Sequence, residues 1–88
     1  MYELERSNSF KKDLKLIKKR GYNLEKLKEI ILKLQRAEKL PFKNKDHNLT
    51  GNWKEYREFH ISPDWLLIYR IQNNILQLAR TGTHADLF

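Results

Sequence analysis

The chain has no cysteine, few residues that break regular structure (three glycines and two prolines) and no long apolar run. The missing cysteines exclude disulfide bonds and are compatible with a reducing compartment. The longest apolar run, residues 65–69, is far shorter than the roughly 20 residues that a membrane-spanning helix needs. Nothing near Met1 resembles a secretion signal. We therefore expect a soluble, cytoplasmic protein.

What the chain does contain is enough apolar and aromatic side chains for one small core. Apolar residues make up 40% of its 88 residues, and there are two Trp, four Tyr and four Phe. This composition is unlike that of a disordered chain. The length is well below that at which cores divide, so residues 1–88 are predicted to form a single domain.

The excess of positive charge lies in the first half of the chain. Eighteen Lys and Arg against eleven Asp and Glu give a net charge of +7. All of this excess lies in residues 1–44, because basic and acidic residues balance in residues 45–88. Such an asymmetry favours a polyanionic partner, with nucleic acid first, an acidic protein second and an anionic membrane third. Alternatively, the lysines only make amphipathic helices soluble.

The first half is predicted to form a strand and two helices. Apolar and polar residues alternate in residues 2–6, which is typical of a short strand. From Ser7 the apolar spacing becomes helical. Residues 7–9 offer N-caps for this helix, and Gly21 supplies its stop. Asn23 caps a second amphipathic helix that ends before Pro41. With so short a connection, the helices should form an antiparallel hairpin.

The second half is predicted to form three consecutive strands. We expect an exposed loop at residues 41–52, then strands at 53–61, 65–69 and 75–81, with turns at 62–64 and 73–74. The continuously apolar middle strand should be buried on both faces. The predicted fold class is therefore α+β, a three-stranded antiparallel meander packed on one side by the helix hairpin, in a mainly antiparallel sheet.

The three histidines lie where this meander brings distant segments together. His47 is in the loop, His60 near the end of a strand and His84 in the C-terminal tail. Strand alternation places Glu58 on the same face as His60. The turn with Asp64 and the end of the last strand reach the same rim of the sheet. The alternative is three ordinary surface histidines.

A metal site is one interpretation of these residues, since imidazoles and a carboxylate are zinc ligands. The spacing does not favour it, because there is no His-Glu-x-x-His sequence and no cysteine. We therefore predict neither metal nor cofactor.

Metal-free cleavage of RNA is the competing interpretation. It needs a base for the ribose 2′-hydroxyl, an acid for the departing 5′-oxygen and a cation beside the phosphorane. Histidine transfers protons near neutral pH, and arginine binds two phosphate oxygens at once. Arg80 is the first candidate for the cation and Arg57 the second.

Arg80 shares its strand parity with Leu76 and Leu78, which should face the core. Either the strand twists or bulges before Arg80, or Arg80 is a structural arginine paired with Glu58 or Asp86.

Two aromatic residues are candidates for stacking on an unpaired base. Trp65 follows the turn but opens the apolar run, so packing in the core is its alternative role. Phe88 is the final residue, and its alternative role is to anchor the C-terminus.

Residues 46–53, 57–69 and 80–88 together resemble the YafQ branch of the RelE-type toxins, with Phe59 where cysteine is often found and Thr83 and Ala85 where serines are common. The resemblance implies a RelE-like fold and a ribosome-dependent, metal-independent endoribonuclease that cleaves mRNA in the A site. It also implies a cognate antitoxin with an acidic C-terminal segment and a ribbon-helix-helix domain. The toxin would contact operator DNA only through this antitoxin.

Carried onto this sequence, the resemblance places the catalytic set on four residues and the phosphate- and base-binding roles on two others: His47, His60, Asp64 and His84, then Arg80 and Phe88. We expect His84 to be the general acid, His60 or Asp64 the base or its orienter, and His47 a substrate-positioning residue. Lysines of the first helix should then bind 16S rRNA: Lys11, Lys15, Lys18 and Lys19. The alternatives are a non-catalytic toxin of the ParE type and a plain RNA-binding module on the same scaffold.

Overall fold

The computed structural model describes residues 1–38, 47–49 and 53–88, with residues 47 and 48 described by their backbone alone. Its strands are β1 (Glu3–Arg6), β2 (His47–Asn48), β3 (Arg57–Ser62), β4 (Trp65–Gln72) and β5 (Ile75–Gly82), and its helices are α1 (Asn8–Lys19), α2 (Leu24–Gln35) and α3 (His84–Leu87). The strands form one sheet in the order β1-β5-β4-β3-β2. Only the pairing of β1 with β5 is parallel, which confirms the predicted α+β fold and mainly antiparallel sheet.

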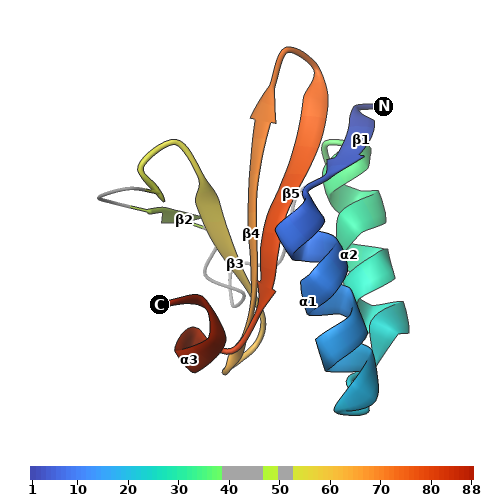
Figure 1. The fold of residues 1–88 in the computed structure, drawn as a ribbon. Coiled ribbons are helices and arrows are strands. Elements are labelled where there is room, and N and C mark those ends of the chain that lie inside the picture. Colours follow the sequence, from blue (N-terminus) through green and yellow to red (C-terminus); the bar gives the residue numbers. More distant parts are fainter. Residues whose placement is uncertain (39–46, 50–52) are drawn as a thin grey trace.

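The helix hairpin forms where its capping residues predict it. The Ser7 hydroxyl accepts a hydrogen bond from the backbone N–H of Phe10, and the Asn23 side chain caps α2 in the same way. Between the helices Gly21 adopts a left-handed φ of 80°, which a residue with a side chain rarely tolerates. The two helices lie side by side next to the β1–β5 side of the sheet (Figure 1). None of the described helices has the length and apolar character needed to span a bilayer.

β4 is buried on both faces, as its apolar run predicts. On the helix side of the sheet, Leu67 and Tyr69 pack with Phe10 and Ile17 of α1. On the other side, here called the open face, Leu66 and Ile68 pack with Leu87 of α3. The tight turn at 73–74 is also confirmed, since both asparagines have positive φ. β4 therefore lies between two apolar layers, one on each face of the sheet.

Four elements differ from the sequence prediction. β4 runs to Gln72, three residues beyond its predicted end. β3 begins at Arg57 rather than at residue 53, because a turn closed by the bond from Tyr56 N–H to the Trp53 carbonyl precedes it. β2 has two residues, too few for an alternating pattern. The expected C-terminal tail contains α3, whose capping box between Thr83 and Asp86 was readable in the sequence. Of the predicted loop, residues 41–46 and 50–52 lie outside the described residues.

A bulge in β5 determines where Arg80 points. Tyr69 pairs with Leu78, but the preceding Ile68 pairs with Arg80, so Ala79 is an extra residue in β5. The bulge shifts the alternation by one position and aligns Arg80 with Ile68 on the open face. This confirms the predicted bulge before Arg80.

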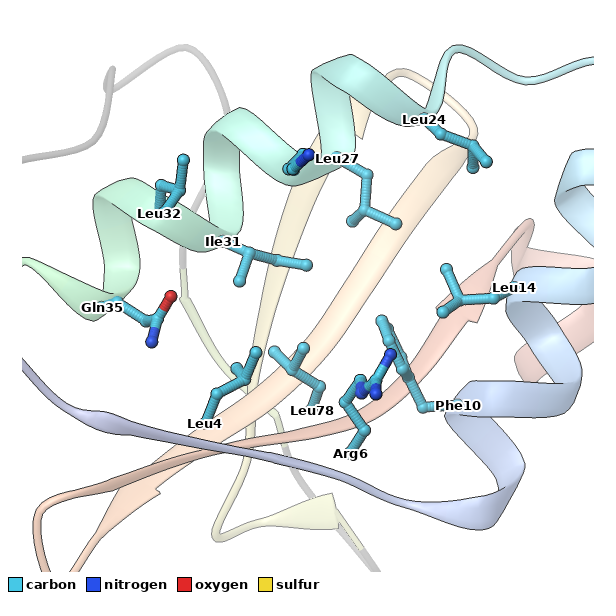
Figure 2. Close-up of a pocket in the computed structure, with 11 residues that line it drawn as sticks. Leu4, Arg6, Phe10, Leu14, Leu24, Leu27, Ile31, Leu32, Gln35 and Leu78 are labelled. Atoms are coloured by element: carbon cyan, nitrogen blue, oxygen red, sulfur yellow. The ribbon is translucent and has the colours of Figure 1, made fainter.

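An apolar groove of about 330 Å³ lies between β1, α1 and α2. In Figure 2, Leu4 and Leu78 on the strands face Ile31 of α2 across it. Leu4 and Leu32 remain 43% and 38% exposed, whereas most of the large apolar side chains described are buried in the core. The groove lining includes Arg6 and Lys28 and, among the described residues, no acidic side chain.

Candidate active site

Three side chains meet on the open face beside α3. Glu58 and His60 lie two residues apart on β3, and His60 Nε2 is 2.6 Å from Glu58 Oε1. His84, the first residue of α3, places Nε2 at 3.8 Å from the same carboxylate oxygen. The two imidazole rings meet edge to face with centroids 5.7 Å apart. Glu58 is only 6% exposed, so the carboxylate at the centre of this cluster is largely shielded from water.

Asp64 holds His84 from the opposite side of the ring. Its Oδ1 lies 2.9 Å from His84 Nδ1 and also accepts the backbone N–H of His84 at 3.2 Å. These two bonds hold the pKa of the Asp64 carboxyl below its usual value, and the bond with the His84 side chain contributes most. The carboxylate therefore fixes the orientation of the ring, and a protonated His84 donates Nδ1–H to Asp64 while Nε2–H points toward Glu58.

The predicted convergence of distant residues at one rim is thus found for Glu58, His60, Asp64 and His84. The backbone of His47 in β2 lies in register with Glu58, next to this group. The side chain of His47 lies outside the described part of the structure.

Arg80 forms an ion pair, but not with either predicted partner. Its Nε and Nη2 donate to the two oxygens of Asp13 at 2.7 and 3.0 Å, and the backbone N–H of Thr81 donates to Asp13 as well. The predicted pairing with Glu58 or Asp86 is wrong, because α1 runs along β5 and brings Asp13 closer. The bond to Asp13 raises the pKa of Arg80 above its ordinary value.

Asp13 is the partner of Arg80 that the sequence analysis missed. It is 8% exposed and is the only acidic residue in the lysine-rich α1. It lies three residues after Phe10 and four before Ile17, in the apolar stripe of the helix. A lone carboxylate on a buried stripe signals a cationic partner, and that signal was available in the sequence.

Two predicted substrate-binding residues lie away from the cluster. Trp65 is 5% exposed, packs edge to face on Tyr22 on the helix side and donates from Nε1 to the Thr81 hydroxyl. It is therefore a core residue, which corrects its assignment to base stacking. Arg57 alternates with Glu58 and pairs in register with Tyr69, so it too lies toward the helix side. Its role beside the phosphate stays a prediction.

Phe88 is 61% exposed, while the preceding Leu87 is 8% exposed. Leu87, not Phe88, is the apolar anchor of α3, and the ring of Phe88 is accessible to solvent. The four lysines predicted to bind RNA are also exposed along α1: Lys11, Lys15, Lys18 and Lys19.

The cluster also has the composition of a metal site. Among the described residues, Glu58, His60 and His84 each offer one ligand atom, and these atoms lie within 4.8 Å of one another. One carboxylate oxygen and two imidazole nitrogens are ligands that zinc and copper accept. The arrangement is thus suited both to proton transfer and to binding a metal ion.

Comparison with known proteins gives one consistent answer. A family described as the bacterial toxin of a type II toxin–antitoxin system, YafQ, matches residues 2–88. The mRNA interferase toxin YafQ of Escherichia coli K12 is 45% identical over 87 residues, which are 98% of this chain and 95% of that protein.

Two solved structures extend the match to the fold. A copper-bound mutant toxin from Helicobacter pylori is 40% identical with a TM-score of 0.94, and the match covers 100% of both chains. The E. coli DinJ–YafQ toxin–antitoxin complex contains a chain that is 44% identical with a TM-score of 0.90, and the match covers 99% of this chain and 97% of that one. With a family match over nearly its whole length, this chain belongs to the YafQ family of toxins of bacterial type II toxin–antitoxin systems.

Proposed function

We propose that the chain is an endoribonuclease that cleaves mRNA in the ribosomal A site by general acid–base catalysis without a metal ion. The enzyme class follows from its family, whose E. coli member is an mRNA interferase. The observation that supports the chemistry is the position of His84, whose ring nitrogens face Asp64 on one side and Glu58 on the other. Such a ring is held in one orientation and is 52% exposed to a substrate.

The reaction then needs two proton transfers. The ribose 2′-hydroxyl loses its proton as its oxygen attacks the adjacent phosphorus, and the bond from phosphorus to the 5′-oxygen breaks as that oxygen is protonated. We assign protonation of the leaving group to His84. Asp64 is engaged in orienting His84, so we assign the base to the closely coupled Glu58–His60 pair.

Arg80 and Phe88 complete the proposal. Asp13 occupies the edge of the Arg80 guanidinium formed by Nε and Nη2 and so fixes its plane. The remaining edge is assigned to the phosphorane oxygens, which develop charge in the transition state. The exposed ring of Phe88 is assigned to base stacking. His47 is assigned to substrate positioning, because its backbone adjoins Glu58.

The lysines of α1 are proposed to bind ribosomal RNA. Reversing the charge of Lys11, Lys15 and Lys18 should weaken ribosome association and the slope of its salt dependence, because each lysine releases counterions from the phosphate backbone. Co-sedimentation with ribosomes at several salt concentrations measures both. If the triple reversal leaves binding and its salt slope unchanged, α1 is a scaffold only.

The antitoxin is proposed to place its acidic C-terminal segment in the groove of Figure 2, and its ribbon-helix-helix domain on operator DNA. The groove combines exposed apolar side chains with Arg6 and Lys28, which suits a segment that is both apolar and acidic.

Leu32→Asp should therefore weaken antitoxin binding by at least about tenfold, since it places an anion beside an anionic segment. Leu16→Asp is the matched control, because Leu16 is similarly exposed at 40% but lies outside the groove lining. Titration calorimetry with the co-expressed antitoxin compares them. Unchanged affinity for the Leu32 variant would exclude the groove as the docking site.

A metal ion in the cluster is proposed to inhibit cleavage, since it would occupy the imidazole nitrogens that transfer protons. Added Zn²⁺ or Cu²⁺ should lower the cleavage rate of purified toxin on programmed ribosomes, and a chelator should restore it. Glu58→Gln should weaken metal binding measured by calorimetry. A rate that requires the metal would contradict metal-independent catalysis.

A further inference from the structure

α3 is too short to hold its own orientation. It has four residues, and isolated helices of this length are not stable in water. Its position on the open face is therefore set by contacts with the rest of the molecule. Leu87 supplies an apolar anchor and Asp64 binds its first residue, His84. A further contact of α3 is an ion pair formed by Asp86.

Asp86 links α3 to the end of α1. Arg20, the residue that caps α1, donates from Nη1 to Asp86 Oδ2 at 2.7 Å and from Nη2 to Oδ1 at 3.2 Å. The backbone N–H of Thr83 donates to the same Oδ2 at 2.9 Å. The pKa of the Asp86 carboxyl is held well below its usual range, mainly by the Arg20 guanidinium and secondly by this backbone bond. The carboxylate is thus charged whenever the enzyme works.

The surrounding backbone is shaped to this carboxylate. A Cβ atom at Gly82 would lie 2.9 Å from Asp86 Oδ2, closer than a Cβ is found to such an atom. Only a glycine leaves room for the side chain to turn back onto its own capping residue. The Asp86 position is therefore built into the connection between β5 and α3.

The connection between β5 and α3 is bound to α1 and its capping residue by two ion pairs. Asp13 lies in α1 and Arg20 caps its end, seven residues or about two helical turns later, so both lie on the same side of the helix. Asp13 binds Arg80 at the end of β5, and Arg20 binds Asp86 in α3. The segment that carries His84 is thus held by two ion pairs. α1 supplies the anion in the first pair, and its capping residue supplies the cation in the second.

We propose that Arg20 is a positioning residue for His84, which acts through the Asp86 carboxylate to keep the imidazole in reach of the Glu58–His60 pair. This inference rests on the proposed ribonuclease function. It separates Arg20 from the other cations of α1: its charge serves the geometry of the site, not the binding of RNA.

A double-mutant cycle tests the proposal. Arg20→Gln removes the guanidinium, and Asp86→Asn removes the negative charge but keeps an oxygen that accepts the Thr83 N–H. Each single variant should lower the single-turnover cleavage rate on saturating programmed ribosomes about tenfold, because small displacements of a catalytic group are costly. The ribosome concentration for half-maximal rate should stay within about twofold. The double variant should be no slower than the slower single one, and Arg20→Lys should recover most of the rate.

Arg36→Gln is the matched control, because Arg36 is an exposed arginine that caps α2 and pairs with Glu38. It should leave the rate unchanged. If Arg20→Gln instead raises the half-maximal ribosome concentration while Asp86→Asn has no effect, Arg20 binds RNA directly and the proposal is overturned. Additive losses in the double variant would overturn it as well.

A readout without catalysis separates this proposal from the function on which it rests. Arg20→Gln and Asp86→Asn should each shift the imidazole NMR signals of His84 in the same direction, and thermal unfolding should confirm that both variants are folded. Unshifted His84 signals overturn the positioning role. If the variants show these shifts but the wild-type protein cleaves no mRNA, the ribonuclease assignment is refuted. The ion pair then still orients α3.

Discussion

His84→Ala is expected to lower the rate of mRNA cleavage by about 10²- to 10⁴-fold, the usual contribution of a general acid. The side chain is half exposed and its contacts are with Asp64 and the edge of the cluster, so its removal leaves the core intact. Loss of toxicity on expression and loss of cleavage sites in primer extension are the measurements.

The fold of this variant is checked independently. Thermal unfolding and antitoxin binding should stay close to those of the wild type, since a surface substitution of this kind costs at most about 1 kcal/mol. A folded His84→Ala variant that still cleaves at the wild-type rate removes His84 from the chemistry. Slowed growth with intact transcripts in the wild type would favour the non-catalytic alternative.

Glu58→Gln is expected to lower the cleavage rate by about 10²-fold. The substitution preserves shape but removes the charge that His60 and His84 both face, at 2.6 and 3.8 Å. Without it, the pair cannot hold the proton taken from the ribose hydroxyl. Single-turnover cleavage on programmed ribosomes measures the loss directly.

Glu55→Gln is the control for the change in charge. Glu55 precedes β3, is exposed and pairs with Arg70 at 3.0 Å, so its neutralisation changes the net charge equally but leaves the cluster untouched. It should cleave like the wild type. An equal loss in both variants would mean that net charge, not the Glu58 carboxylate, sets the rate.

Much of the fold was predictable because local signals and packing agree. The helix caps at Ser7 and Asn23 and the turn at 73–74 act over a few residues, and each forms as expected. The apolar run of β4 required burial on both faces, and it is covered on both. Elements shorter than one period, such as β2, carry too little pattern to be recognised.

The site was predictable in its membership but not in its pairings. Strand alternation alone placed Glu58 beside His60, and the meander brought Asp64 and His84 to the same rim. The partner of Arg80 depended on a bulge and on the path of α1, which are tertiary features. Of the two roles that the sequence left open for Trp65, the structure shows the one in the core, because Trp65 shares a face of β4 with Leu67 and Tyr69.

The central claim is that the open-face cluster uses the ribose 2′-hydroxyl of the message as its nucleophile. The most direct test is cleavage of an mRNA on programmed ribosomes with a single 2′-deoxy substitution at the scissile nucleotide, compared with the all-ribose message. We predict that the ribose message is cut to leave a 2′,3′-cyclic phosphate and that the deoxy message stays intact at that position. Equal cleavage of both messages at the same bond would contradict the account.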